Sequence, residues 1–199
     1  LEFRRVLFRS LDSKGEIPNE VMPDKLHPMA LGYRLWAMAM EPTLAKLLGQ
    51  PSRSVDDPHN SAVVPVTQQR DNYNWMDRHN AVLLEMKRQK PELVFIGDSI
   101  THGWGGRPTT PGRESGTAAY NGAFGVWNPV NMGFGWDRTE NVLWRLEQGE
   151  LDHVYPKGVV IMIGTNNLGF NTAEEIRDGV FAVVRHVHEH APEARVLVL

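Results

Sequence analysis

Short apolar runs alternate with amphipathic stretches along the second half of the chain. Apolar runs at residues 93–96, 129–132, 158–163 and 195–199 are typical of buried strands. The run GVVIMI at 158–163 is apolar on both faces and rich in β-branched residues, as strands of parallel sheets are. Between these runs, residues 74–90 and the stretches after Asp137 and Thr172 have apolar residues at helical spacing. The alternation predicts a parallel sheet covered by helices.

Helix-end signals refine these boundaries. Glu140 follows Asp137 and Glu175 follows Thr172 at the three-residue spacing of a capping box, so we expect a helix to begin at each pair. Near the N-terminus, Pro28 suits the first turn of a helix that runs to Leu48, with Gly49 as its C-terminal cap and Pro42 as a kink. Residues 51–67 are rich in Pro, Ser, Asp and Asn without a sustained period, which predicts a linker or a surface loop.

Composition narrows the class of protein. The chain has 199 residues, 41% of them apolar, which is enough for a globular α/β core. A formal charge of −3 without a basic run argues against nucleic acid or an anionic membrane as partner. No apolar stretch approaches the ~18 residues of a membrane span, so we expect a soluble protein. Cysteine is absent, which excludes thiolate sites and leaves the compartment open, secretion and the periplasm included.

Parallel sheets bind ligands at the carboxyl ends of their strands, so the residues after each apolar run are the candidates for chemistry. Ser99 follows the first run and suits an acyl-transfer nucleophile, although a turn in which the serine caps a helix is the commoner explanation of Gly-Asp-Ser taken alone. Asn166 follows the third run and suits an oxyanion donor, although an Asx turn explains it too. The glycine-bearing loop at 133–137 offers backbone N–H groups, or is an ordinary connection. The segment after Ser99 lacks the second glycine of a Gly-x-Ser-x-Gly elbow, which disfavours the α/β-hydrolase fold.

Three strings resemble conserved blocks of the SGNH/GDSL hydrolases, in family order. They are ELVFIGDSITHGW for block I, NMGFGWDRTENVLWRLEQGEL for block II and VVIMIGTNN for block III. Within the family, the strings are similar to members of the platelet-activating-factor acetylhydrolase catalytic-subunit type and of the bacterial carbohydrate-acetylesterase type. The resemblance implies an α/β, flavodoxin-like three-layer α/β/α fold with a parallel sheet, here truncated at the C-terminus.

The resemblance also implies roles for individual residues. Ser99 is the expected nucleophile, and the expected oxyanion donors are its own N–H, the Asn166 side chain and the backbone N–H just before Asp137. At this last position the family commonly has glycine, whereas this chain has Trp136. A backbone donor survives that change if the local conformation suits a residue with a Cβ atom, and Gly135 is the neighbouring candidate.

A serine nucleophile needs a base, normally a histidine oriented by a carboxylate. The family takes both from an Asp-x-x-His of block V near its C-terminus. The segment Asp24-Lys25-Leu26-His27, with Gly32-Tyr33 after it, resembles this block at the other end of the chain. We therefore expect residues 1–10 to be a junction, 11–49 the end of one SGNH domain, 50–73 a linker and 74–199 a second, incomplete SGNH domain. The alternative is that Asp24 and His27 fold back onto Ser99, as in a circular permutant.

The expected activity is hydrolysis of short-chain, acetyl esters through an acyl-enzyme, on a carbohydrate first and a lipid second, without metal or organic cofactor. The alternatives are a non-catalytic carbohydrate-binding or interaction module and an inactive fragment. His186 and His190 share a helix face at i,i+4 spacing, but without a His-Glu-x-x-His pattern solvated histidines are the better interpretation, and no metal site is predicted. His102 is expected to line the pocket. Oligomerisation is left open.

Overall fold

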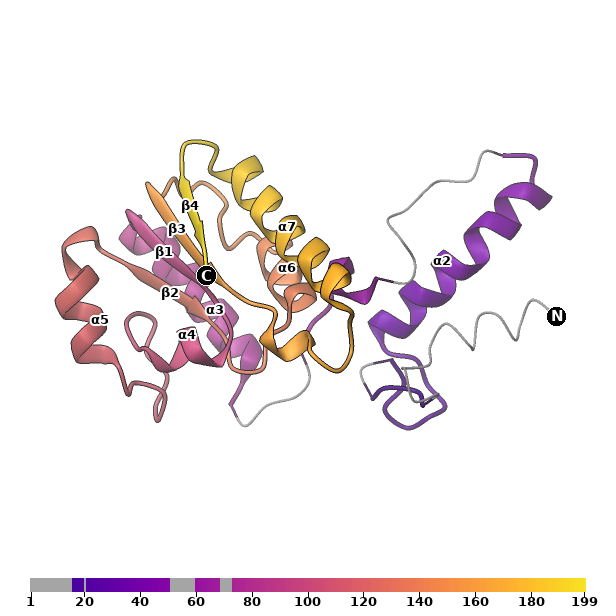
Figure 1. The fold of residues 1–199 in the computed structure, drawn as a ribbon, viewed down its shortest axis with the longest axis horizontal. Helices are drawn as coiled ribbons and strands as arrows, with labels where there is room; N and C mark the ends of the chain where they lie inside the picture. The colour runs from indigo at the N-terminus through magenta and orange to yellow at the C-terminus, as the bar shows by residue number, and fades with distance from the viewer. Residues whose placement is uncertain (1–15, 20, 51–59, 69–72) are drawn as a thin grey trace.

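The computed structural model describes residues 16–19, 21–50, 60–68 and 73–199. The predicted junction at 1–10, residues 11–15 and 20 of the predicted segment 11–49, and residues 51–59 and 69–72 of the predicted linker lie outside these residues. The described part contains an α/β domain built on a parallel sheet, and the candidate residues predicted after the apolar runs follow the strands of this sheet. Helix α2 (Ala30–Leu47) lies apart from the sheet (Figure 1).

The sheet contains four strands among the described residues: β1 (Leu93–Gly97), β2 (Val130–Gly133), β3 (Gly158–Met162) and β4 (Arg195–Val198). Their order is β2-β1-β3-β4, and every neighbouring pair is parallel. Gly97 at the end of β1 pairs with Gly133 of β2 and with Met162 of β3. Because β1 lies between β2 and β3, the residues that follow these three strands emerge side by side at one edge of the sheet.

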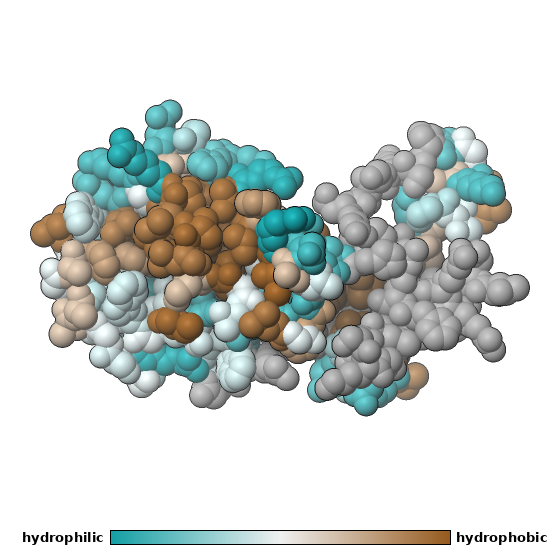
Figure 2. Space-filling view, viewed as in Figure 1, coloured by the Kyte–Doolittle hydropathy of each residue, from teal (hydrophilic) through white to brown (hydrophobic). Residues whose placement is uncertain are grey.

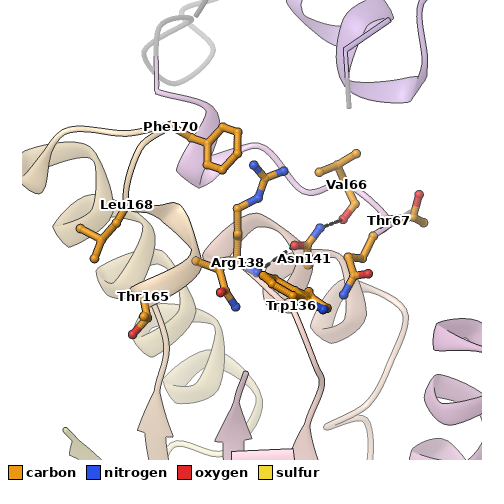
Figure 3. A pocket seen from close by; sticks show the side chains of 10 residues that line it. Val66, Thr67, Trp136, Arg138, Asn141, Thr165, Leu168 and Phe170 are labelled. Atoms are coloured by element: carbon orange, nitrogen blue, oxygen red, sulfur yellow. Dashed lines mark hydrogen bonds between the residues drawn. The ribbon is translucent and has the colours of Figure 1, made fainter. Parts of the chain in front are cut away.

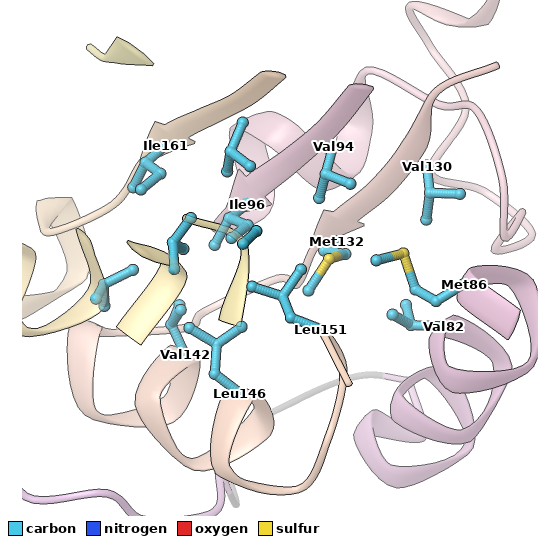
Figure 4. Packing of buried hydrophobic residues seen from close by; sticks show 14 of the residues in the cluster. Val82, Met86, Val94, Ile96, Val130, Met132, Val142, Leu146, Leu151 and Ile161 are labelled. Atoms are coloured by element: carbon cyan, nitrogen blue, oxygen red, sulfur yellow. The ribbon is translucent and has the colours of Figure 1, made fainter. Parts of the chain in front are cut away.

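Helices cover both faces of this sheet. Helices α3 (Trp75–Gln89), α6 (Thr139–Glu147) and α7 (Ala173–His190) bury one face in a single apolar core (Figure 4). On the opposite face of β1, Phe95 packs against Trp104 and the helix α5 (Thr117–Phe124). The predicted α/β fold with three layers and a parallel sheet is confirmed.

Of the two predicted capping boxes, one is confirmed and one is wrong. The Glu175 carboxylate accepts the Thr172 N–H at 2.8 Å, and the Thr172 hydroxyl accepts the Glu175 N–H at 3.2 Å. Helix α6 instead begins after Arg138, whose N–H donates to Asn141 at 2.8 Å. The Asp137 carboxylate does not cap this helix because it is buried and bound by side-chain donors.

The N-terminal segment carries helix α2 (Ala30–Leu47), with Pro42 inside it and Gly49 at φ +64° just beyond. The predicted helix is confirmed, although it begins at Ala30, two residues after the predicted position of Pro28 in its first turn. A small apolar cluster joins this segment to the rest of the chain, and its buried members are Val21, Met22, Leu31, Leu35, Val64 and Val66.

The described part of the predicted linker packs against the α/β domain. It contains the short helix η1 (Ser61–Val63), in which Ala62 is completely buried. The Ala62 carbonyl accepts the Thr139 hydroxyl at 2.8 Å, and the Val66 N–H donates to the Glu140 carbonyl at 3.1 Å. Residues 60–68 therefore connect the N-terminal segment to α6 while being fixed on that helix.

Apolar side chains gather over the part of the sheet formed by β3 and β4 (Figure 2). Leu197, Val198 and Leu199 are each about half exposed or more. Among the described helices, none has the length and apolarity that crossing a membrane requires.

Candidate active site

Ser99 is the first residue of the short helix α4 (Ser99–Gly103), directly after β1, and it is exposed. The helix cap is the preceding residue: Asp98 is buried, and its Oδ1 accepts the Ile100 N–H at 2.9 Å. Burial raises the pKa of Asp98. Since Asp98 caps the helix, the Ser99 hydroxyl is not engaged in capping. The first N–H groups of a helix have no intrahelical acceptor, so the backbone beside this hydroxyl favours negative charge.

Two glycines let α4 lie directly on the ends of the strands. A Cβ atom on Gly133 would stand 2.3 Å from the His102 backbone nitrogen, and one on Gly97 would stand 2.2 Å from the Thr101 hydroxyl. The buried side chain of Asn131 donates to the Thr101 carbonyl at 2.7 Å. Helix α4 is thus fixed against β1 and β2, which determines the position of Ser99.

The loop after β2 is held from two sides. The Gly135 N–H donates to Nδ1 of the buried His102 at 3.1 Å, and the Gly135 carbonyl accepts from Gln68 at 2.6 Å and from Tyr73 at 3.3 Å. The next residue, Trp136, has φ +67° and a side chain that is 49% exposed. Trp136 therefore adopts the left-handed conformation that favours glycine, with its indole directed away from the core.

A buried charged network supports this loop from below. The Asp137 carboxylate accepts from Trp75 Nε1 at 2.7 Å and from Arg145 Nε at 2.9 Å. Arg145 also pairs with Glu150, which binds His79 Nδ1 at 2.7 Å. Burial raises the pKa of Asp137 to about 6, although the Arg145 guanidinium acts in the opposite direction. The network fixes the backbone on the C-terminal side of Trp136.

The turn after β3 contains two asparagines with different partners. Asn167 is buried, and its side chain accepts the Thr139 N–H at 3.0 Å and donates to Glu140 at 2.9 Å. Asn166 is half-buried and donates one side-chain N–H to the Asp137 carbonyl at 2.9 Å. A side-chain amide has two N–H donors, so the contact with Asp137 orients Asn166 and leaves a second donor.

A pocket of about 210 Å³ lies beside these loops (Figure 3). Asn166 and Trp136 both line it, together with Arg138, whose guanidinium lies 4.7 Å from the centre of the Phe170 ring. Val66, which also belongs to the N-terminal apolar cluster, lines the same pocket. The pocket therefore adjoins both the predicted oxyanion residues and the segment that anchors the N-terminal part of the chain.

Asp24 and His27 form the local arrangement that their spacing suggests. The Asp24 carboxylate accepts the His27 N–H at 2.7 Å and lies 2.6 Å from His27 Nδ1. These hydrogen bonds hold the pKa of the Asp24 carboxyl well below its usual range. The His27 side chain is 75% exposed. The carboxylate thus orients the imidazole as a base requires.

The structure brings some predicted site residues together and leaves others apart. Gly135, Trp136 and Asn166 lie around one loop and one pocket. The segment that carries Asp24 and His27 lies with α2, away from α4 (Figure 1). Within the described residues, no hydrogen bond links Ser99 to His27. The roles of Ser99, Asp24 and His27 therefore stay predictions.

Sequence reasoning missed several residues that shape the site. Gln68 and Tyr73 hold Gly135, and Arg138 and Phe170 line the pocket. Gln68 and Tyr73 lie in the C-terminal part of the predicted linker, where aperiodic composition gave no reason to expect a contact with a distant loop. Phe170 had a usable signal: it is an apolar residue in a polar turn after a strand end.

An exposed serine on a short helix after the central strand, with an asparagine turn after the adjacent strand of a parallel three-layer sheet, is characteristic of the SGNH/GDSL class of hydrolases. The sequence profile of the GDSL-like lipase/acylhydrolase family matches residues 95–199, and the chain belongs to this family.

Individual proteins are similar to this chain. Platelet-activating factor acetylhydrolase IB subunit alpha1 from Bos taurus is 38% identical over 73% of this chain and 58% of its own length. The alpha2 subunit from Rattus norvegicus is 35% identical over 63% of this chain and 50% of its own. The solved structure of a putative platelet activating factor from Streptococcus pneumonia aligns with a TM-score of 0.43 and 21% identity, covering 63% of this chain and 56% of that one. The chain thus spans about half the length of the curated relatives it matches.

Proposed function

We propose that this protein hydrolyses short-chain acyl esters, in the first place acetyl esters, through an acyl-enzyme on Ser99. The observation that carries this proposal is the exposure of Ser99 at the start of α4 while Asp98 takes the capping role. A serine placed only to cap the helix would have its hydroxyl on the backbone of α4. Membership in an acylhydrolase family and similarity to proteins named acetylhydrolases support the acetyl group as the leading candidate.

In the proposed reaction, Ser99 Oγ attacks the ester carbonyl carbon and its proton passes to a base. The carbonyl oxygen becomes an oxyanion, which the second N–H of Asn166 and the backbone N–H groups of Ser99 and Trp136 stabilise. The tetrahedral intermediate collapses, the alcohol leaves with the proton, and the acyl group stays on Ser99. Water then attacks this ester by the same route and releases the acid.

For the base we propose His27, with Asp24 as the residue that orients it. Two observations support this assignment: the Asp24 carboxylate already binds His27 Nδ1, and the N-terminal segment packs on Val66, which lines the pocket beside Asn166. In the structure His27 makes no contact with Ser99, so the assignment requires the segment before α2 to move toward α4 during the reaction.

The experiment is active-serine titration of the complete chain with a fluorophosphonate. We expect stoichiometric labelling that Ser99→Ala abolishes and that Ser115→Ala, a change at an exposed serine outside the site, leaves unchanged. His27→Ala should slow labelling by about 10²–10⁴-fold, whereas His153→Ala should not. Absence of labelling in folded protein would contradict the esterase proposal and favour a non-catalytic carbohydrate-binding or interaction module. Equal labelling of His27→Ala would overturn only the assignment of the base.

The alcohol part of the substrate is a finer question that a kinetic comparison of two acetyl esters resolves. We propose acetylated carbohydrate as the first class and acetylated lipid as the second. The half-exposed indole of Trp136 and the ring of Phe170 line the same pocket and offer apolar surface to either alcohol. Comparing kcat/KM for an acetylated xylo-oligosaccharide and for a short-chain acetyl glycerophospholipid would rank the two classes.

A further inference from the structure

A second cluster of reactive side chains lies at the C-terminal end of α7. His186, Glu189 and His190 each present one ligand atom there, and these atoms all lie within 4.8 Å of one another. The two imidazole rings are stacked, with centres 4.2 Å apart and planes 11° from parallel. Asp152, in the turn between α6 and β3, has its Oδ1 3.8 Å from His190 Nε2. Three side chains that bind transition metals thus converge at the end of α7, and a fourth lies beside His190.

The Nε2 nitrogen of both imidazoles is available to a ligand. His190 Nδ1 lies 3.0 Å from the His186 carbonyl oxygen, to which it donates. His186 Nε2 is buried and has no hydrogen-bond partner among the described residues. In metal sites a ligating histidine typically donates its other ring N–H to a carbonyl or carboxylate, and the His190 ring has this arrangement.

We propose that His186, Glu189 and His190 bind a divalent transition-metal ion, Zn²⁺ foremost, with Asp152 as the fourth ligand. Imidazole nitrogens with carboxylate oxygens suit Zn²⁺, whereas Mg²⁺ and Ca²⁺ prefer oxygen ligands alone. Zinc binds nitrogen and oxygen at ~2.0–2.2 Å in a tetrahedral geometry, which places its donors about 3.3 Å apart. Small side-chain rotations at the surface close the present separations to that value. The ion would link the end of α7 to the turn before β3.

This site is distinct from the proposed catalytic centre, which lies at the carboxyl ends of the strands. The end of α7 and the turn at Asp152 precede β4 and β3, so they lie at the opposite edge of the sheet. Metal binding here is therefore expected to stabilise the fold without taking part in ester hydrolysis. An ion that binds only the folded chain stabilises it by mass action.

The test is titration of the tag-free chain with Zn²⁺ by calorimetry and with Co²⁺ by visible absorption. We expect one ion per chain, a visible spectrum typical of Co²⁺ with a low coordination number, and a rise in Tm when Zn²⁺ is added. Glu189→Gln and His190→Ala should each weaken binding at least about tenfold. His188→Ala is the matched control, because His188 is exposed on the same helix outside the cluster, and it should keep wild-type affinity.

Two results would overturn the proposal. One is the absence of a one-to-one Zn²⁺ complex in the folded chain. The other is an equal loss of affinity in His188→Ala and Glu189→Gln, which would mean scattered surface binding. Glu189 is exposed, so Glu189→Gln decides the question even if His190→Ala impairs folding.

Discussion

The backbone N–H of Gly135 donates to Nδ1 of His102 at 3.1 Å, which joins the loop after β2 to the helix that begins at Ser99. This bond requires Nδ1 to be unprotonated. Burial, together with the positive charges of Arg78, Arg113 and Arg145, lowers the pKa of His102 to about 3. The neutral imidazole is thus part of the framework that positions the candidate nucleophile.

Acid should destabilise the protein through His102. Its pKa is about 3 in the folded chain and about 6.5 when unfolded, so the unfolded chain takes up the proton first. The contribution of the neutral ring to stability is complete above pH 6.5 and is lost as the pH falls from 6.5 toward 3, by up to ~1.4 kcal/mol per pH unit. Urea unfolding of His102→Asn, which keeps an acceptor for Gly135, should show a shallower decline over this range. An unchanged slope would contradict the assignment, and His188→Asn serves as control.

Trp136→Gly should stabilise the protein. A left-handed conformation costs a residue with a Cβ atom roughly 1–2 kcal/mol, and Trp136 has φ +67° with a half-exposed side chain. We expect a gain of about 1 kcal/mol in the free energy of unfolding, measured in urea. Trp127 is exposed to the same degree but has no left-handed backbone, so Trp127→Gly should destabilise. Loss of stability in Trp136→Gly would show that contacts of the indole outweigh the backbone strain.

Gly133→Ala should displace α4 from the sheet. The new Cβ atom would stand 2.3 Å from the His102 nitrogen and 2.6 Å from the Thr101 carbonyl carbon, both backbone atoms that cannot move independently. We expect a loss of about 1–3 kcal/mol in stability and slower labelling of Ser99. A Cβ atom on Gly122, within α5, would meet no atom of a neighbouring element within 4 Å, so Gly122→Ala should be neutral or stabilise by up to ~1 kcal/mol. Similar effects of the two changes would refute the packing argument.

The two asparagines of the turn after β3 should separate activity from stability. Asn166→Ala removes the proposed side-chain oxyanion donor and should lower kcat about 10²–10³-fold with little change in unfolding. Asn167→Ala removes the acceptor of the buried Thr139 N–H and one donor to the Glu140 carboxylate, and should cost about 1–3 kcal/mol. Ester hydrolysis and urea unfolding of both variants are the measurements. If the Asn166→Ala variant kept the wild-type kcat, Asn166 would have no part in the mechanism.

Arg145→Met should be strongly destabilising. Arg145 is completely buried and pairs with both Asp137 and Glu150, so its removal leaves two buried carboxylates without their cation. Breaking a buried pair in this way costs about 3–5 kcal/mol. The exposed pair of Arg177 with Asp178 is the comparison, and Arg177→Met should cost less than about 1 kcal/mol. A small effect at Arg145 in thermal unfolding would mean that the network adds no net stability.

The sequence by itself determined the strands, most of the helices and the parallel sheet, because apolar period and the capping box at Thr172 are local properties of the chain. It also placed Ser99 and Asn166 after two of these strands, and the structure shows that the two strands are neighbours. It did not predict the bounds of α4 or α5, which are too short to show a clear apolar period.

Only the tertiary structure decided which polar residue does what at the strand ends. Asp98 rather than Ser99 caps α4, because its carboxylate is the one that reaches the Ile100 N–H. Asp137 was expected to cap α6 but is drawn into a buried network by Trp75 and Arg145, which come from distant or later positions in the chain. Asn166 and Asn167 are adjacent residues of the same type, so local sequence does not distinguish them. Asn167 is the one that is buried against Thr139, and Asn166 faces the pocket. Such assignments depend on burial and on partners far along the chain, which local spacing does not contain.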